Sequence, residues 1–438
     1  MGALPPGAAR LPPRVFLQRR SRGRRVSLQR RFAEEMGALL GPDFPEEVAL
    51  AVSGGADSMA MLALAHEWAR VWGVRLRVVT VDHGLRAESA AEARMVAAEC
   101  ALLGHEHAVL RWSWEGRGNK MDAARRGRLA LIDAWRGAVR HVLLAHSRDD
   151  VAESFLMRLA RGAGGDGLAA MAPLRALLLQ PSVPAEPGGA AAGMVLVRPC
   201  LGMSRAELRH HATVLKVPFV DDPSNADPRF DRARMRRLLA LLEAEGLDRA
   251  ALAGAAERLR ADRDVLQADV LRAWEAGGEE HPGWLSLAPD WAAGVALATQ
   301  RRLLARMLRW VAGRDYAPRA APLDALLDRV LSGGGGTLHG CEVAHLGGRV
   351  AVFREHGAIC GLGAVGGLWD GRWQAPEAGG ALRALGDAGW QALDPAERGP
   401  VPHRIARVLP VVWRDGRPDP AAGLRWIAPR FTQFLMTH

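Results

Sequence analysis

The chain is poor in several residue types and lacks long apolar runs, and these shortages argue against particular metal sites and against membrane insertion. Its 438 residues include only two lysines, one tyrosine and four widely spaced cysteines without a C-x-x-C pair. This cysteine usage argues against a zinc knuckle or an iron–sulfur site and favours a reducing compartment. No run approaches the roughly 18–20 uncharged apolar residues of a membrane helix, and the N-terminus lacks the apolar core of a secretory signal. We therefore expect a cytoplasmic protein without a membrane partner.

Positive charge is abundant, and nearly all of it is arginine. The formal net charge is +10, while hydrophobic residues make up 49% and charged residues 24% of a chain that should bury a substantial core. Arginine forks bidentately onto phosphates and stacks on bases, so nucleic acid is a natural partner. A GC-rich coding bias explains the arginine-to-lysine ratio, but it would not suppress acidic residues.

Apolar runs alternate with helical stretches over the first half of the chain. Strands are predicted at 48–52, 74–81, 106–112, 140–145 and 194–198, and helices at about 28–40, 57–71, 88–103, 121–137 and 149–160. This alternation is typical of βαβ units, and it predicts an α/β fold with a doubly wound parallel sheet. Ligands bind such sheets at the carboxyl ends of the strands.

The remaining segments suggest four parts. Residues 1–26 combine prolines and arginines without acids, which indicates a disordered basic arm. Residues 161–193 are rich in Gly, Pro and Ala and should be loop, while helices resume over about 204–216 and 232–276. We predict a catalytic domain over 27–220, a helical segment over 221–284 and a smaller α+β domain over 285–438.

The segment S-G-G-A-D-S follows the first predicted strand. It comprises Ser53, Gly54, Gly55, Ala56, Asp57 and Ser58. It lacks the lysine and spacing of a nucleotide P-loop and the glycine pattern of a Rossmann turn. Two glycines before a helix can instead form a nest of N–H groups for an anion. Asp57 would repel a bare phosphate, so we expect it either to hold Mg²⁺ between itself and phosphates or to cap the helix.

Charged residues recur at two other strand ends. Asp82 and His83 lie at the end of the second strand, and Arg86 follows them. His83 could donate a hydrogen bond to a phosphate or an adenylate oxygen, and Arg86 could offset developing negative charge. His146, Asp149, Asp150 and Glu153 follow the fourth; the last two are three residues apart and share a helix face. Such acids could hold Mg²⁺ or a cationic substrate. Alternatively they only complement the helix dipole.

Arginines gather on two predicted helices. Arg125 and Arg128 are three residues apart and could reach one phosphate together. The turn D-D-P-S-N (221–225) precedes an arginine-rich helix start that includes Arg232 and Arg236. A solvated basic surface would explain any single one of these arginines equally well.

Together these motifs resemble the tRNA(Ile)-lysidine synthase family of the PP-loop ATP pyrophosphatase superfamily, across about residues 45–245. The resemblance implies an adenine nucleotide alpha hydrolase-like fold with a C-terminal tRNA-binding region, and a possible homodimer. It implies a ligase that uses ATP and Mg²⁺ to adenylate the wobble cytidine of a CAU-anticodon tRNA(Ile), after which free L-lysine displaces AMP.

The resemblance also assigns roles. These are catalysis by Asp57, His83, Arg86, Arg125 and Asp150; nucleotide binding by residues 53–58, Asp82 and His146; substrate binding by Asp149, Glu153, Arg128, Arg232 and Arg236; and metal binding by Asp57 and Asp150.

The chain departs from the family pattern at Ser147, Val151 and Ser154. It also departs at Met121 and Leu129, in a segment whose match to the family is weaker. Two alternatives therefore stay open. One is a PP-loop tRNA thiolase, for which Cys100 and Cys200 are the candidate cysteines. The other is a non-catalytic RNA-binding relative.

Overall fold

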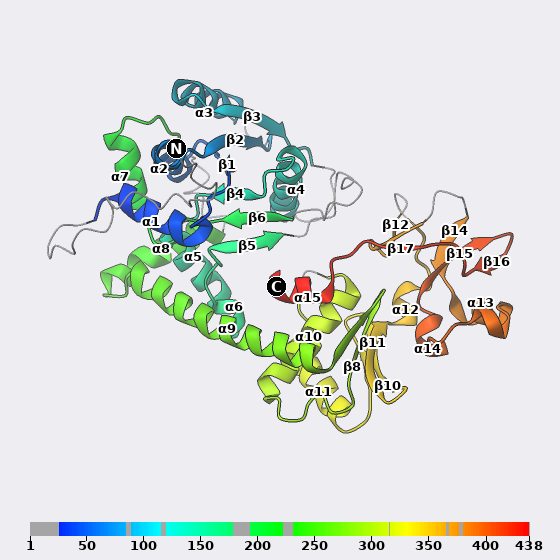
Figure 1. The fold of residues 1–438 in the computed structure, drawn as a ribbon. Coiled ribbons are helices and arrows are strands. Elements are labelled where there is room, and N and C mark those ends of the chain that lie inside the picture. The colour runs from blue at the N-terminus through cyan, green and yellow to red at the C-terminus, as the bar shows by residue number, and fades with distance from the viewer. Residues whose placement is uncertain are drawn as a thin grey trace, which may run out of the picture.

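A computed structural model describes residues 26–84, 89–114, 120–177, 193–221, 231–314, 316–364, 368–375 and 380–437 (Figure 1). The expected basic arm lies almost entirely outside this range, as do Arg86 and most of the turn after Asp221. Within the described residues, no helix is both long and apolar enough to cross a membrane.

The N-terminal half is built on a six-stranded sheet in the order β3-β2-β1-β4-β6-β5. Its strands are β1 (Glu47–Ala51), β2 (Arg75–Asp82), β3 (Glu106–Arg111), β4 (His141–Leu144), β5 (Leu174–Leu177) and β6 (Met194–Val197). Neighbouring strands pair in parallel except β5, which is antiparallel to β6. This confirms the predicted parallel sheet, but β5 was wrongly expected to be loop.

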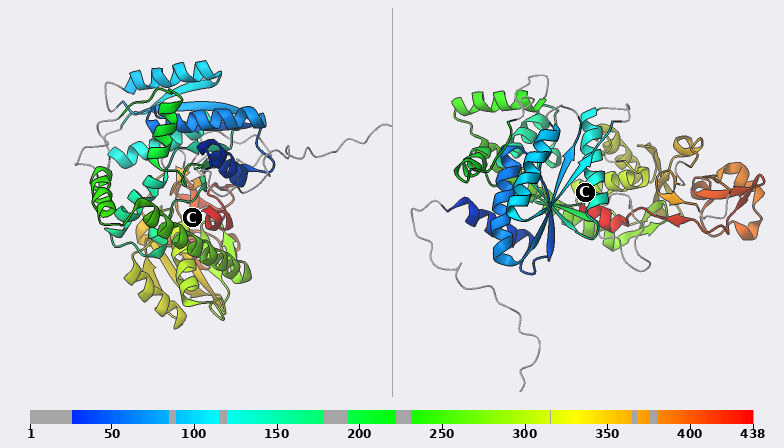
Figure 2. Two further views of the ribbon diagram at one scale, coloured as in Figure 1. Left: turned by 90° about the vertical axis from the view of Figure 1, so that its left-hand side faces the viewer. Right: turned by 90° about the horizontal axis from the view of Figure 1, so that it is seen from above.

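Helices cover both faces of this sheet (Figure 2). The helices of this half are α1 (Leu28–Leu40), α2 (Ala56–Trp72), α3 (Ser89–Leu103), α4 (Lys120–Trp135), α5 (Arg148–Leu159), α6 (Gly165–Leu168) and α7 (Arg205–Val214), of which the short α6 lies against α5 and against α9 (Arg249–Gly277). Alternate residues of β1 separate the two cores. Leu50 packs with α1, α2, α3 and α7, whereas Ala49 packs with Ile132 of α4. This is the doubly wound arrangement that the alternating pattern predicts.

Two helices join the sheet to the second half of the chain. The predicted helix over 232–276 is divided into α8 (Asp231–Ala244) and α9 (Arg249–Gly277), because Gly246 adopts a φ of +88° and Asp248 caps a new helix. Helix α5 packs through Val151 against α9 and through Leu156 against α8 and α9. The start of α5 is thereby held between the sheet and the helical segment.

The second half contains small antiparallel sheets and helices, as expected. A five-stranded sheet, β7-β8-β11-β10-β9, packs with the helices α10 (Leu297–Ala312), α11 (Ala320–Leu331) and α15 (Phe431–Thr437). Its strands are β7 (Gly278–His281), β8 (Trp284–Leu287), β9 (Gly336–Leu338), β10 (Cys341–Leu346) and β11 (Arg349–Arg354).

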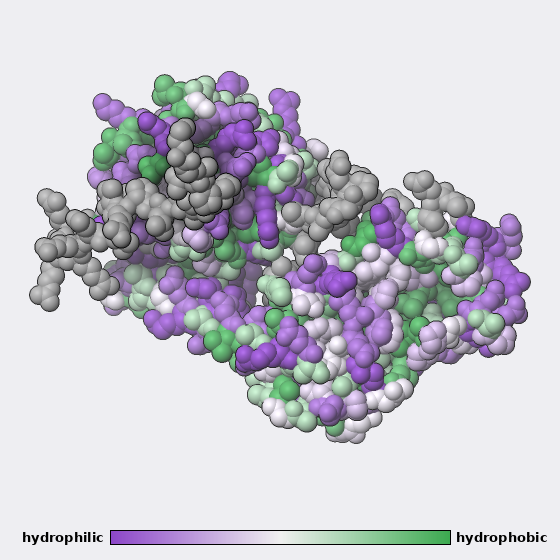
Figure 3. All heavy atoms as spheres, in the orientation of Figure 1, coloured by the Kyte–Doolittle hydropathy of each residue, from purple (hydrophilic) through white to green (hydrophobic). Residues whose placement is uncertain are grey.

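Beyond β11 lie two three-stranded sheets, β12-β13-β17 and β14-β15-β16. They comprise β12 (Leu368–Trp369), β13 (Trp373–Gln374), β14 (Ala381–Ala384), β15 (Pro410–Arg414), β16 (Arg417–Asp419) and β17 (Arg425–Trp426), with the short helices α12 (His356–Ile359), α13 (Gly386–Ala392) and α14 (His403–Ala406). The face of the molecule in Figure 3 mixes hydrophilic and apolar residues, with hydrophilic side chains gathered near α9 and at the outer end of this last part.

Candidate functional site

The glycine turn, residues 53–58, joins β1 to α2. Gly54 has a φ of +88°, which favours glycine, and Gly55 occupies the N-cap position of α2 without a side-chain cap. Ser58 Oγ lies 2.9 Å from the Gly55 carbonyl oxygen and accepts from the Ser53 backbone N–H at 3.2 Å. The Ser58 hydroxyl therefore braces the turn, and the start of α2 presents N–H groups suited to an anion.

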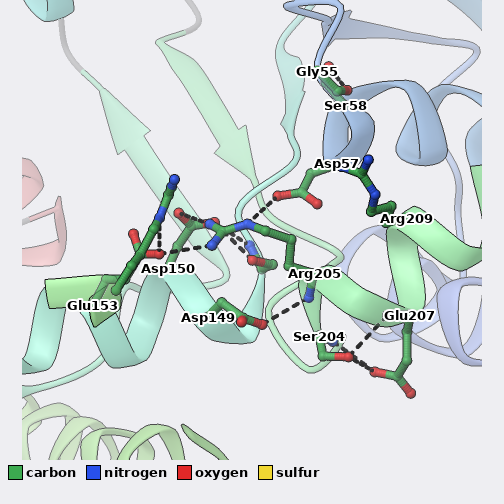
Figure 4. Close-up of polar contacts among 12 residues, drawn as sticks. Gly55, Asp57, Ser58, Asp149, Asp150, Glu153, Ser204, Arg205, Glu207 and Arg209 are labelled. Atoms are coloured by element: carbon green, nitrogen blue, oxygen red, sulfur yellow. Dashed lines mark hydrogen bonds and ion pairs between the residues drawn. The ribbon is translucent and has the colours of Figure 1, made fainter. Parts of the chain in front are cut away.

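Asp57 is in the first turn of α2, but it is not the cap. Its Oδ2 lies 3.2 Å from Arg205 Nε, and its Oδ1 is buried without a hydrogen-bond partner among the described residues (Figure 4). Burial raises the pKa of Asp57 to about 6, against the opposing effect of Arg205. The capping alternative is thus excluded, and a buried carboxylate oxygen remains available beside the glycine turn.

Two acids at the start of α5 are held in place by hydrogen bonds. Asp150 Oδ2 accepts from the Ser147 backbone N–H at 2.9 Å and from Ser147 Oγ at 3.0 Å. Asp149 Oδ2 accepts from the Arg205 backbone N–H at 2.8 Å. Burial raises the pKa of Asp150, but the Arg205 charge and the Ser147 N–H outweigh it and hold that pKa below its usual value.

Glu153, one turn further along α5, is the most buried acid of the site. Its side chain is 1% exposed, and its Oε1 accepts from Arg205 Nη1 at 2.9 Å and from Arg236 Nε at 2.7 Å. Its Oε2 has no partner in the described part of the chain. The predicted common face of Asp150 and Glu153 is confirmed, because both contact the same guanidinium.

Arg205, the residue that gathers these acids, was not predicted from the sequence. It is the first residue of α7, and one side chain reaches Asp57 on α2 and two acids on α5 (Figure 4). A signal was present in the sequence. Ser204 and Glu207 form a capping box that places Arg205 in a first helical turn, where a cation is disfavoured unless acids lie nearby.

Basic side chains form a second group at the same edge of the sheet. His83, Arg128, His146 and Arg198 each have a buried side-chain nitrogen without a partner among the described residues, and we call these four the basic cluster. Burial lowers the pKa of His83 and of Arg128, and Arg128 lowers that of His83 further. Burial likewise lowers the pKa of Arg198 to about 10 and that of His146 to about 4, although the Asp150 charge opposes the latter shift.

Arg198 is another residue that sequence reasoning did not single out. It follows β6, is almost fully buried, and donates from Nη1 to the Ala172 carbonyl oxygen at 2.5 Å. A buried guanidinium with an unpaired N–H and neighbouring cations is costly without an anion. The basic cluster is therefore suited to a phosphate.

The other predicted residues are more peripheral. Asp82 Oδ1 accepts from the Gly84 backbone N–H at 2.8 Å, which lowers the Asp82 pKa and closes the turn after β2. Arg125 and Arg232 are exposed, although their charges still reach the buried Arg128. Among the described residues, no three His, Cys, Asp or Glu side chains are grouped to hold a metal ion.

The two cysteines considered for sulfur chemistry are both buried. Burial raises the pKa of the Cys100 thiol to about 12 and also raises that of Cys200. A reactive cysteine needs a low pKa and some exposure, so neither thiol is suited to sulfur transfer.

Comparison with known proteins places these features in a family. The PP-loop domain family matches residues 28–242. The chain is 38% identical to a tRNA(Ile)-lysidine synthase from Ruegeria pomeroyi over 87% of this chain and 90% of that protein. It is 39% identical to a tRNA(Ile)-lysidine synthase from Hyphomonas neptunium over 72% of this chain and 83% of that protein. The chain belongs to the tRNA(Ile)-lysidine synthase family.

Among solved structures, the chain is similar to a U34-tRNA thiolase NcsA from Methanococcus maripaludis. The TM-score is 0.42 at 17% sequence identity, covering 53% of this chain and 79% of that one.

Ser147 is one of the positions at which the chain is expected to depart from the family pattern. Ser147 is at the N-cap position of α5 and hydrogen-bonds to Asp150. In this chain Ser147 therefore orients this acid at the first turn of α5.

Proposed function

We propose that this protein joins free L-lysine to the wobble cytidine of a CAU-anticodon tRNA(Ile) in two steps, of which the first consumes ATP. One observation carries the proposal beyond family membership. Within the described residues, buried nitrogens of the basic cluster and buried carboxylate oxygens lack partners at one edge of the sheet, and the charges of His146 and Asp150 interact there. A site that must hold both a phosphate and an ammonium needs these two chemistries.

In the first step, the ring carbonyl oxygen of cytidine attacks the α-phosphorus of ATP, and pyrophosphate leaves. The glycine turn would hold the departing phosphates at the start of α2. Arg128 and Arg198 would donate to the oxygens of the transferred phosphate, whose negative charge is then stabilised by fixed donors. His83 would donate to the same group, with Arg125 and Arg86 offsetting its negative charge; Arg86 lies outside the described residues.

In the second step, the lysine amine attacks the ring carbon that bears the adenylated oxygen. The carbon–nitrogen bond forms, the carbon–oxygen bond breaks, AMP leaves with that oxygen, and the nitrogen gives up its proton. Asp150 and Glu153 would receive the lysine ammonium, with Asp149 fixing the position of α7 through the Arg205 backbone N–H.

Mg²⁺ fits the site through Asp57. Its Oδ1, buried beside the glycine turn and without a partner among the described residues, is a hard oxygen ligand, and Mg²⁺ is commonly bound by one or two carboxylates together with substrate phosphates. The ion would supply charge neutralisation of the leaving pyrophosphate. Both Asp150 oxygens already carry hydrogen bonds or an ion pair, so a contact from Asp150 to the metal would require Arg205 to move.

We also propose that residues 285–438 contact the tRNA, with Arg232 and Arg236 nearer the site. The test supplies purified protein with ATP, Mg²⁺, labelled lysine and tRNA(Ile). We expect one AMP per lysine incorporated, and no incorporation into a tRNA with uridine at the wobble position. Transfer of label from a sulfur donor would instead support the thiolase alternative, and tRNA binding without AMP formation would support the non-catalytic one.

A further inference from the structure

The guanidinium of Arg205 contacts three carboxylates on two helices. Its Nε lies 3.2 Å from Asp57 Oδ2, its Nη2 3.3 Å from Asp150 Oδ1 and its Nη1 2.9 Å from Glu153 Oε1 (Figure 4). The first two separations are longer than the 2.7–2.9 Å of a typical charge-assisted hydrogen bond. The guanidinium is thus shared rather than committed to one strong bidentate partner, and its side chain is 29% exposed, which leaves it room to move.

Glu153 cannot be approached by another cation while this arrangement persists. Its side chain is 1% exposed, and Arg205 and Arg236 both donate to its Oε1. Its Oε2 has no partner among the residues that the structure describes, although a buried carboxylate oxygen is costly to leave unpaired. An incoming ammonium could therefore reach this carboxylate by taking the place of a cation already there.

We propose that Arg205 occupies the ammonium site of the amino-acid substrate and withdraws from Asp150 and Glu153 when that substrate binds. This inference rests on the proposed function, since it takes the two acids as the ammonium acceptors. Arg236 stays, because its 2.7 Å contact with Glu153 is the shorter of the two. Arg205 is accordingly a positioning residue that competes with the substrate.

The nucleotide supplies a destination for the displaced guanidinium. Arg205 Nε already contacts Asp57, in the first turn of the helix whose start would hold the phosphates. Guanidinium groups bind phosphate oxygens bidentately, so bound nucleotide phosphates would draw Arg205 toward α2 and away from α5. Nucleotide and lysine should then each strengthen the binding of the other by the same factor.

The test measures lysine binding by calorimetry to the wild type, to Arg205→Gln and to Arg209→Gln. Arg209 is a matched control one turn along α7, because its two hydrogen bonds to Asp221 leave Asp150 and Glu153 to Arg205, although the Arg209 charge also acts on Asp57. Without nucleotide, Arg205→Gln should bind lysine at least about fivefold more tightly than the wild type, the low end of usual coupling factors. Arg209→Gln should match the wild type.

A non-hydrolysable ATP analogue with Mg²⁺ provides the second arm. It should tighten lysine binding to the wild type and have a smaller effect on Arg205→Gln. Unchanged or weaker lysine binding by Arg205→Gln would overturn the proposal and make Arg205 a purely structural link. If Arg205→Gln does not fold, Arg205→Lys should show an intermediate gain, because one ammonium cannot span three carboxylates.

The same measurements separate this inference from the proposed function. Lysidine formation by the wild type without a gain in lysine affinity for Arg205→Gln would overturn the inference alone. Absence of both lysidine formation and lysine binding in every variant would overturn the proposed function, and the inference with it.

Discussion

Arg236 Nε lies 2.7 Å from Glu153 Oε1, which joins α8 to the acid-bearing helix α5 through a nearly fully buried carboxylate. Helix α8 is also packed against α5 through Leu239 and Leu156. The charged contact is therefore embedded in an apolar interface between the sheet and the helical segment.

Glu153→Gln tests this interface. The variant keeps the shape but loses the charge that Arg205 and Arg236 share, so we expect destabilisation by about 2 kcal/mol, limited because both arginines are part exposed and can be hydrated. Urea unfolding at neutral pH measures the change. Glu245→Gln, on the exposed residue just after α8, is the control and should change stability by less than about 0.5 kcal/mol.

Asp57→Asn should abolish AMP formation without loss of stability. Because burial raises the Asp57 pKa to about 6, the folded state binds this proton more tightly than the unfolded state does. The resulting stability is present below about pH 4 and is lost as pH rises through 6, an upper limit of about 3 kcal/mol. The variant should escape this loss and equal or exceed the wild type at pH 7 in unfolding experiments. A large fall in its melting temperature with AMP formation retained would contradict a role in the reaction.

His146→Gln should change stability with pH in the opposite sense. Burial lowers the His146 pKa to about 4, so the folded state resists protonation and the wild type loses stability as pH falls from about 6.5 to 4. The substitution removes that loss, again at most about 3 kcal/mol. Denaturant midpoints at pH 5 and 7.5 measure it. Equal pH slopes for the variant and the wild type would show that His146 does not titrate in this range.

Arg198→Gln tests the role of the basic cluster. Loss of a preorganised charged donor should lower the rate of ATP-dependent pyrophosphate release by about 100-fold or more. The free energy of unfolding should fall by less than the activation free energy rises, because the substitution removes a buried charge that is incompletely paired among the described residues. Arg140→Gln, on the exposed residue before β4, is the control and should release pyrophosphate at the wild-type rate.

The parallel sheet was predictable because its strands are short apolar runs separated by helices with a clear period. Strand β5 was not, because Leu174–Leu177 is half exposed and precedes a stretch rich in Gly, Pro and Ala. Its pairing with β6 depends on a neighbour outside its own sequence. The break between α8 and α9 was also missed, because an isolated glycine inside a helical pattern is tolerated and does not by itself mark the end of a helix.

The candidate site was predicted in part. Asp57, Asp150 and Glu153 could be picked out because strand ends meet at one edge of a parallel sheet. Arg198 could not, and the capping box around Arg205 did not show which acids that arginine meets, since both arginines follow β6, far along the chain from their partners. Spacing within one motif says nothing about which helix terminus from another segment will face it. The charge balance of the site therefore emerges only from the fold.

Helix α15 has a consequence for the order in which the molecule assembles. Phe431, Phe434 and Leu435 complete the core formed by α9, α10 and the five-stranded sheet, and Phe431 packs edge-on against Trp274. Trp310 also donates to the Pro429 carbonyl oxygen at 2.9 Å. During synthesis the sheet that carries the site can form once β6 and α7 have emerged. The second core is complete only after Phe431, Phe434 and Leu435 have been synthesised, so the sheet, together with the helices α8 and α9 that pack on α5, can fold before it.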